Sequence, residues 1–160
     1  IISIIACHNV CNLSTFVVYN CIKQNVFLKN MNKNNHINVD FKNAEAKVKA
    51  NIILISFKEQ DNYIVYSPHL EVTGYGKSED EAMQSFNHCL GVFLDYTVNK
   101  KTLHKELISL GWDLKKGSTK NPKKINAPSM SDLLKHNTAL EELLNKQNIT
   151  TMQKEVSIPV

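Results

Sequence analysis

The chain has 160 residues, of which 42% are apolar, and this is enough for one domain with its own core. Its mean hydropathy of −0.27 is typical of a soluble protein and argues against a bundle of membrane-spanning helices. The formal charge is +4, and all 19 basic residues are lysines. Lysine binds phosphate but lacks the planar fork with which arginine reads guanine, so major-groove guanine readout is disfavoured.

The positive charge is concentrated in one short segment. Residues 99–126 carry 8 lysines and 2 acids, a net charge of +6, whereas residues 31–98 carry 6 lysines and 9 acids, a net charge of −3. Residues 127–160 have a net charge of −1. We therefore expect an acidic central part that is followed by a basic linker.

Residues 1–43 are expected to precede the folded part of the chain. The first thirty residues are apolar but interrupted by histidine and asparagine, so the run falls short of the ~20 residues that span a bilayer. Because the first methionine is Met31, we expect residues 1–30 to be translated upstream sequence, and an additional N-terminal hairpin is the alternative. No membrane association is expected.

Three strands are predicted in the acidic part. The run at 52–55 is apolar on both sides, which predicts a central strand over 51–57. The polar turn at 59–62 joins it to an alternating strand over 63–67, so a hairpin is expected. A third strand over 70–73 extends the hairpin into an antiparallel meander.

A strongly marked helix follows the strands. Ser78 is a typical N-cap, and Glu81 stands three residues later, which predicts a capping box. Gly74 and Gly76 are expected to adopt backbone angles that residues with a Cβ resist. The predicted buried face of the helix consists of Ala82, Phe86, Leu90, Phe93 and either Tyr96 or Thr97.

A second, short helix is predicted over 102–110. Gly111 ends it in the C′ position, and residues 112–115 are expected to form an edge strand that its tryptophan anchors to the core. The core domain is therefore placed at 44–115. Residues 116–126 are rich in Lys, Gly, Asn and Pro and are expected to form a basic linker.

Residues 127–160 are predicted to form a helix–strand extension. Capping boxes are expected at Ser129 with Asp132 and at Thr138 with Glu141. The sequence leaves open whether one helix runs over 130–146 or two helices break at residues 137–138. The apolar stripe consists of Met130, Leu133, Leu134, Leu140, Leu143 and Leu144.

Alternation over 153–160 predicts a final edge strand, with Val156 and Ile158 on its buried side and Pro159 at its end. The predicted fold class is α+β: an antiparallel β-β-β-α core with a short helix and an edge strand, followed by the C-terminal helix–strand extension.

Catalytic chemistry is not indicated. The six histidines show no His-x-x-x-His spacing, and the chain contains no Gly-x-Ser-x-Gly, phosphate-binding loop or dinucleotide fingerprint. The cysteines, three of which lie in the first thirty residues, lack the second ligand pair of a zinc site. Cys89 is expected as a buried thiol on the long helix. We therefore expect a cytoplasmic protein that is not an enzyme and holds no metal or cofactor.

The stretch from Tyr66 to Ala82 resembles the HicB family of antitoxins. The resemblance is carried by Tyr66-Ser67-Pro68-His69-Leu70 and by Gly74-Tyr75-Gly76-Lys77-Ser78-Glu79-Asp80-Glu81-Ala82. It covers residues 48–98, and Glu71-Val72 stands where the family often has Pro-Gly. It implies a β-β-β-α core similar to a worn-down ribonuclease H fold, whose motif residues are Pro68, Leu70, Gly74, Gly76, Ser78 and Ala82.

The resemblance implies a partner and a surface. Such antitoxins cover the active site of a small basic mRNA-cleaving toxin, here a HicA-like protein, and often repress their own operon through DNA binding. Charge complementarity then places the toxin interface among the acids Glu71, Glu79, Asp80 and Glu81. A homo-oligomer is also expected.

Two alternatives stay open. One is an orphan homo-oligomeric module of the same fold without a toxin, which would self-associate through the stripe from Met130 to Leu144 and the strand at 153–158. The other is a nucleic-acid binder that acts through the lysines of the linker. The lysines concerned are Lys115, Lys116, Lys120, Lys123 and Lys124.

Overall fold

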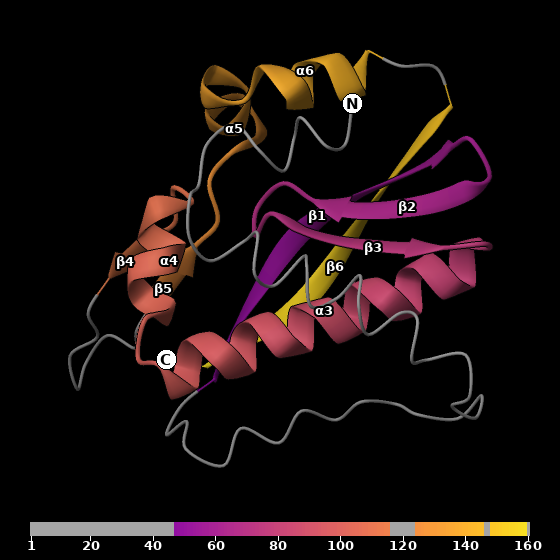
Figure 1. Cartoon of the computed structure of the whole chain (residues 1–160). Helices are drawn as coiled ribbons and strands as arrows, with labels where there is room; N and C mark the ends of the chain where they lie inside the picture. The colour runs from indigo at the N-terminus through magenta and orange to yellow at the C-terminus, as the bar shows by residue number, and fades with distance from the viewer. Residues whose placement is uncertain (1–46, 116–123, 146–147, 160) are drawn as a thin grey trace.

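The computed structural model describes residues 47–115, 124–145 and 148–159, and these form a mixed α+β fold. One four-stranded antiparallel sheet lies between α3 on one face and α5 and α6 on the other (Figure 1). The elements are β1 (Lys47–Glu59), β2 (Asn62–Ser67), β3 (Val72–Gly76), α3 (Glu79–Asn99), α4 (Leu103–Ser109), β4 (Asp113–Lys115), β5 (Lys124–Asn126), α5 (Met130–His136), α6 (Thr138–Leu144) and β6 (Ile149–Pro159).

The first three strands form the predicted antiparallel meander. β1 pairs with β2 around a tight turn in which Glu59 lies opposite Asn62, which confirms the hairpin. The third strand runs from Val72 to Gly76. The predicted range of 70–73 therefore starts two residues too early and ends three residues too early. The reason is Glu71, whose φ of 52° interrupts the extended chain immediately before the strand.

The C-terminal strand belongs to the same sheet. β6 pairs with β1 over eleven positions, from Lys47 opposite Pro159 to Phe57 opposite Ile149. The strand order is β3-β2-β1-β6, so β1 is internal, as its apolar run predicted, and β6 lies at an edge. Residues 149–159, which the sequence placed in an extension, thus complete the sheet that starts at residue 47.

Helix α3 begins with the predicted capping box. The Ser78 hydroxyl accepts a hydrogen bond from the Glu81 amide at 3.2 Å, while the Glu81 carboxylate accepts from the Lys77 amide at 2.8 Å, one residue earlier than expected. Cys89 is buried and disulfide-bonded, which corrects the expectation of a free thiol. The buried side of the helix consists of Ala82, Ser85, Phe86, Cys89, Leu90, Gly91, Phe93, Leu94 and Thr97.

Gly74 and Gly76 are required by close packing and not by unusual backbone angles. Neither has a positive φ; among the described glycines only Gly111 does, at +85°. A Cβ on Gly74 would lie 2.2 Å from the backbone nitrogen of Phe86, and one on Gly76 would lie 2.4 Å from that of Ala82. The two glycines therefore let β3 and α3 approach to backbone contact.

The other face of the sheet is covered by α5 and α6. Leu140 and Leu143 of α6 are 1% and 2% exposed, and they pack with Ile55 and Tyr66 of the sheet. Because successive strand residues point to opposite faces, Ile52 and its even-numbered neighbour Leu54 join the α3 side instead. This explains why the 52–55 run is apolar at every position.

Two short helices, rather than one, form the α5–α6 layer. Ser129 caps α5 as predicted, since its hydroxyl accepts from the Asp132 amide at 3.2 Å. The cap of α6 is Asn137 and not Thr138: its side-chain oxygen accepts from the Leu140 amide at 2.9 Å. The prediction of a capping box at Thr138 and Glu141 was therefore wrong, because Asn137, one residue earlier, is the N-cap of this helix.

Residues 113–115 and 124–126 form a small two-stranded sheet of their own. β4 pairs with β5 and not with the main sheet, so Trp112–Lys115 is no edge of that sheet, and the linker ends in a strand at 124–126. Trp112 is 3% exposed and anchors this part to the core, as predicted. The short helix α4 ends at Ser109, and Gly111 follows it in the left-handed conformation.

Candidate interaction surfaces

Acidic side chains from two segments gather at one end of the sheet. The β1–β2 turn carries Glu59 and Asp61, and it lies beside the end of β3 because Tyr63 pairs with Gly76. The chain then passes directly into α3. We call the resulting surface the acidic end; it consists of Glu59, Asp61, Glu79, Asp80 and Glu81.

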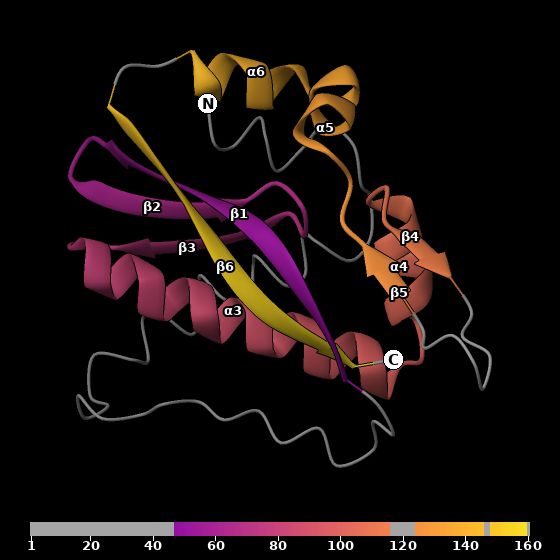
Figure 2. The same ribbon diagram turned by 180° about the vertical axis from the view of Figure 1, so that it is seen from behind.

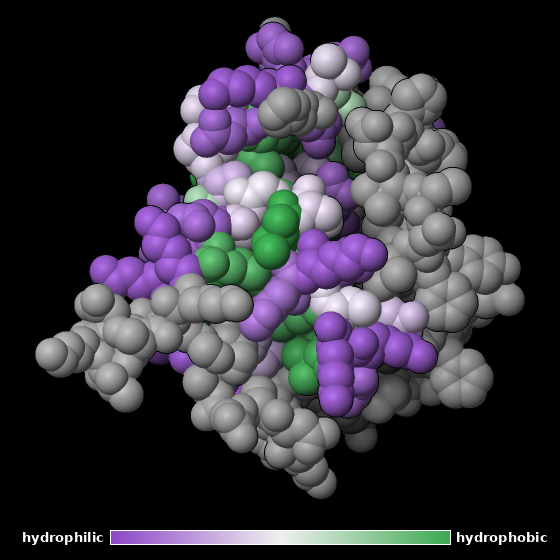
Figure 3. All heavy atoms as spheres, turned by 90° about the vertical axis from the view of Figure 1, so that its left-hand side faces the viewer, coloured by the Kyte–Doolittle hydropathy of each residue, from purple (hydrophilic) through white to green (hydrophobic). Residues whose placement is uncertain are grey.

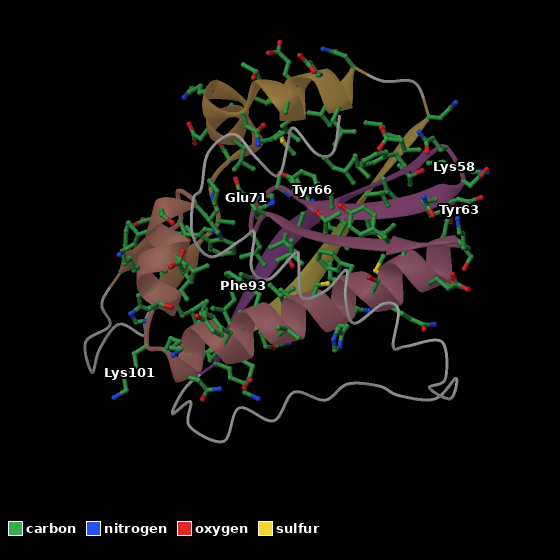
Figure 4. The ribbon with its side chains drawn as sticks, in the orientation of Figure 1. Lys58, Tyr63, Tyr66, Glu71, Phe93 and Lys101 are labelled. Carbon is green, nitrogen blue, oxygen red and sulfur yellow. The ribbon has the colours of Figure 1, made fainter. Side chains whose placement is uncertain are left out.

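The acidic end is exposed, and none of the ion pairs among the described residues involves it. All five acids are exposed except Glu59, which is partly exposed. The ion pairs within the described ranges are Lys49–Glu155, Lys115–Asp113 and Lys135–Asp132, and none of them involves these acids. Only Lys58 and Lys77 stand nearby in the chain, so five acids face two lysines, a net charge of −3. Lys58 lies over the Tyr63 ring, 5.3 Å from its centroid (Figure 4).

Glu71 does not join the acidic end. It lies before the first residue of β3, whereas the acidic end follows the last, and five strand residues separate the two by ~17 Å. Figure 4 shows Glu71 near Tyr66, away from Lys58 and Tyr63. Glu71 is half-buried, and burial raises its pKa. Burial, and secondarily the charge of Glu71, also raise the pKa of Tyr66.

The six motif residues that carry the resemblance to the HicB family serve to pack or cap the elements around them. Pro68 and Leu70 are buried in the β2–β3 turn, and Ala82 is fully buried on α3. Ser78 caps α3, and the two glycines permit the contact between β3 and α3. These residues therefore position Glu79 and Asp80, which begin the helix, without themselves offering a binding surface.

A basic end lies at the other terminus of α3. We use this name for Lys100, Lys101, Lys105, Lys115 and Lys124, which surround α4, β4 and β5. Lys115 lies directly opposite Lys124 in the two-stranded sheet, so the structure brings these two predicted lysines together. Lys116, Lys120 and Lys123 lie outside the described residues. Figure 3 views the molecule from this side, where hydrophilic atoms surround a smaller hydrophobic area.

The charge of the basic end is partly offset. Glu106 and Asp113 lie among its five lysines, which leaves a net charge of +3, and Lys115 is 3.5 Å from Asp113 in an exposed pair. In Figure 4, Lys101 lies far from Lys58 and Tyr63. The described part of the chain is therefore polarised along α3, negative where the helix begins and positive where it ends.

His69 is a structural residue that the sequence did not reveal. It is 4% exposed, its Nδ1 accepts from the Ile53 amide at 3.2 Å, and its carbonyl accepts from the Trp112 indole at 2.7 Å. The ring also hydrogen-bonds to the backbone of Pro128. One turn residue thus links β1, the start of β4 and the segment before α5. No periodicity or spacing marks such a residue, because its partners are backbone groups.

The described residues do not assemble a metal centre: no group of three or more His, Cys, Asp and Glu side chains among them could hold an ion. No helix in the described ranges is long and apolar enough to cross a membrane. In comparisons with known proteins, no protein-family model, curated protein or solved structure matches this chain.

Proposed function

We propose that this chain is a HicB-like antitoxin, a binding protein that neutralises a small basic mRNA-cleaving toxin. The observation that supports the proposal is the acidic end, where two strand-turn acids and the first turn of α3 present an exposed net charge of −3. Such a surface suits a basic, RNA-binding partner, because complementary charge accelerates association and excludes wrong partners. Inhibition would be steric and electrostatic, in the cytoplasm.

The geometry refines the interface that the resemblance implies. Glu79 and Asp80 are exposed at the start of α3, and the β1–β2 turn adds Asp61, which the sequence reading did not include. Glu81 has a second role, because its carboxylate accepts from the Lys77 amide. Glu71 is set aside, since it lies at the other end of β3 and is half-buried.

The first test is a pull-down of the tagged full-length chain from its native host, read by mass spectrometry. Recovery of one small basic protein at equal stoichiometry is the expected result. The triple variant Asp61→Lys, Glu79→Lys and Asp80→Lys should then lose that protein, while Glu81 is kept so that the helix remains capped. Recovery of the tagged chain alone would contradict the proposal.

A matched control separates the site from the overall charge. Glu141 and Glu142 are exposed on α6, at a distance from the acidic end in sequence and in layer. Changing both to Lys alters the net charge by four units, against six for the triple variant, but should leave the partner bound. Equal loss of the partner in both variants would show that net charge, and not this surface, governs binding.

The second candidate function is nucleic-acid binding at the basic end. It is favoured by the cross-strand pairing of Lys115 with Lys124, which places two exposed cations at the base of a lysine-bearing connection. Binding to generic RNA or DNA should weaken steeply with salt, because each phosphate contact releases counterions. Binding that does not change in the variant Lys120→Ala, Lys123→Ala and Lys124→Ala would exclude this function.

A further inference from the structure

The outer edge of β6 is open. β6 is the last strand in the order β3-β2-β1-β6, so no described strand pairs with its far side. Figure 2 shows β6 in front of β1, with no described helix over it. An edge strand of eleven residues presents a row of backbone N–H and C=O groups that can pair with another strand.

The first half of this edge lacks the usual protection against pairing. Residues 149–153 carry no charge and no proline, and Ile149, Thr150 and Thr151 favour an extended chain. The next residue, Lys154, turns away from the edge: its Nζ lies 5.9 Å from the Phe86 ring centroid and donates to the Asn87 side chain, both on α3. The charge that commonly blocks an edge is therefore directed to the helix.

An exposed apolar side chain lies at the middle of the unprotected stretch. Met152 is 38% exposed and lies opposite Leu54 of β1, so it extends the apolar α3 side of the sheet to its rim. Ile108 on α4, at 60%, is the other large apolar side chain exposed in the described residues. Met152 is the one of the two that adjoins an unpaired strand edge.

We propose that two copies of this chain associate through their β6 strands, antiparallel and with Met152 on the two-fold axis. The two sheets then form one continuous sheet of eight strands, and the Met152 side chains face each other with Cβ atoms ~5 Å apart. This register brings no like charges together. Its cross-strand pairs are Met152 with Met152, Thr151 with Gln153, Thr150 with Lys154, and Ile149 with Glu155.

Registers centred two or three residues further along the strand bring like charges together. Moving the axis to residue 154 would oppose two Lys154 side chains, and moving it to residue 155 would oppose two Glu155 side chains. The occupant is a second copy because the uncharged stretch 149–153 can pair with itself without opposing like charges, and this pairing covers the exposed Met152 with its own counterpart. The stripe from Met130 to Leu144, the other predicted self-association surface, instead packs on the sheet through Leu140 and Leu143.

The test begins with the mass of the full-length chain in solution, by light scattering over a concentration series. The expected result is a species of twice 18.2 kDa that dissociates on dilution. Met152→Lys should give a monomer with unchanged circular dichroism, because two ammonium groups would then meet on the axis. Ile108→Lys makes the same chemical change on α4 and should leave the dimer intact.

The register is tested by mixing. Met152→Lys and Met152→Glu should each be monomeric alone, and an equimolar mixture should recover the dimer, because residue 152 then pairs with its opposite charge. A wild-type chain that is monomeric throughout, or a dimer that survives Met152→Lys, would overturn the proposal. A tighter dimer from Met152→Glu alone would also overturn it, since residue 152 would then face Lys154. These outcomes are independent of any toxin.

Discussion

The indole Nε1 of Trp112 donates to the carbonyl oxygen of His69 at 2.7 Å, across 43 residues of sequence. The two rings also meet edge to face, with centroids 6.4 Å apart. Since both residues are buried, this contact fixes the β2–β3 turn to the segment that follows α4. The same turn contacts β1 and the start of α5 through the His69 ring.

Trp112→Phe should destabilise the fold by about 1–3 kcal/mol, because it leaves the buried His69 carbonyl without a donor. Urea unfolding followed by circular dichroism measures the change. Tyr96→Phe is the control: it removes one polar atom from a partly exposed aromatic residue of α3 and should shift the free energy of unfolding by less than about 0.5 kcal/mol. Equal effects would show that the indole hydrogen bond does not contribute.

Stability should fall on acidification through His69. Burial lowers the pKa of His69 below its ordinary 6.5, and this outweighs the opposing effect of the hydrogen bond to Pro128. The unfolded chain therefore binds the proton more readily. The contribution is fully present above pH ~6.5 and is lost as the pH falls through the lower folded-state pKa. Protonation of Nδ1 would also end its role as acceptor for the Ile53 amide.

Denaturant midpoints between pH 7.5 and pH 5 measure this dependence in the wild type and in His69→Gln, which should be flatter. Glu71→Gln separates the neighbouring carboxyl, whose raised pKa acts in the opposite sense: its contribution is present at low pH and is lost as the pH rises. The His69 slope should persist in that variant. An unchanged slope in His69→Gln would contradict the assignment.

Gly74→Ala should cost about 3 kcal/mol or more, because the new methyl group would lie 2.2 Å from a backbone nitrogen of α3 that cannot rotate away. Gly111→Ala is the matched comparison. It has room, with its nearest neighbour at 3.5 Å, but a φ of +85°, so about 1–2 kcal/mol is expected. Thermal unfolding of both variants ranks them, and the reverse order would mean that β3 and α3 are not in backbone contact.

Asn137→Ala should destabilise α6 by about 1 kcal/mol, because its side chain accepts from the Leu140 amide at 2.9 Å. Thr138→Ala, one residue later, should have little effect, since Thr138 is the first residue of the helix and not its cap. Chemical denaturation of the pair gives the comparison. A larger loss of stability from Thr138→Ala than from Asn137→Ala would support the capping box at Thr138 and Glu141 that the sequence predicted.

Local chemistry made most of the secondary structure predictable. The β1–β2 hairpin, the Ser78 cap, the buried face of α3 and the glycine after α4 each depend on residues within a few positions of one another. Two of the errors were also local in origin. The positive φ of Glu71 delays the start of β3 to Val72, two residues after the predicted start. Asn137, and not the predicted Thr138, caps α6. A HicB-like fold and function remain proposals.

The candidate site was only partly predictable. Glu79 and Asp80 were identified from the sequence as acids of the acidic central part, and both lie in the exposed first turn of α3. Asp61 was missed, since only the pairing of β2 with β3 brings the β1–β2 turn beside that start. Glu71 was included for its negative charge, although a whole strand separates it from the other acids.

The sequence by itself determined most of the helices and strands of this protein, the caps of α3 and α5, and the segregation of charge along the chain. Only the tertiary structure decided that residues 149–159 pair with β1, that Gly74 is required by a helix backbone, and that His69 joins three segments. The physical reason is that caps and periodicity arise from contacts a few residues apart. Strand partners, backbone clashes and backbone acceptors are set by segments distant in sequence, and no local pattern records them.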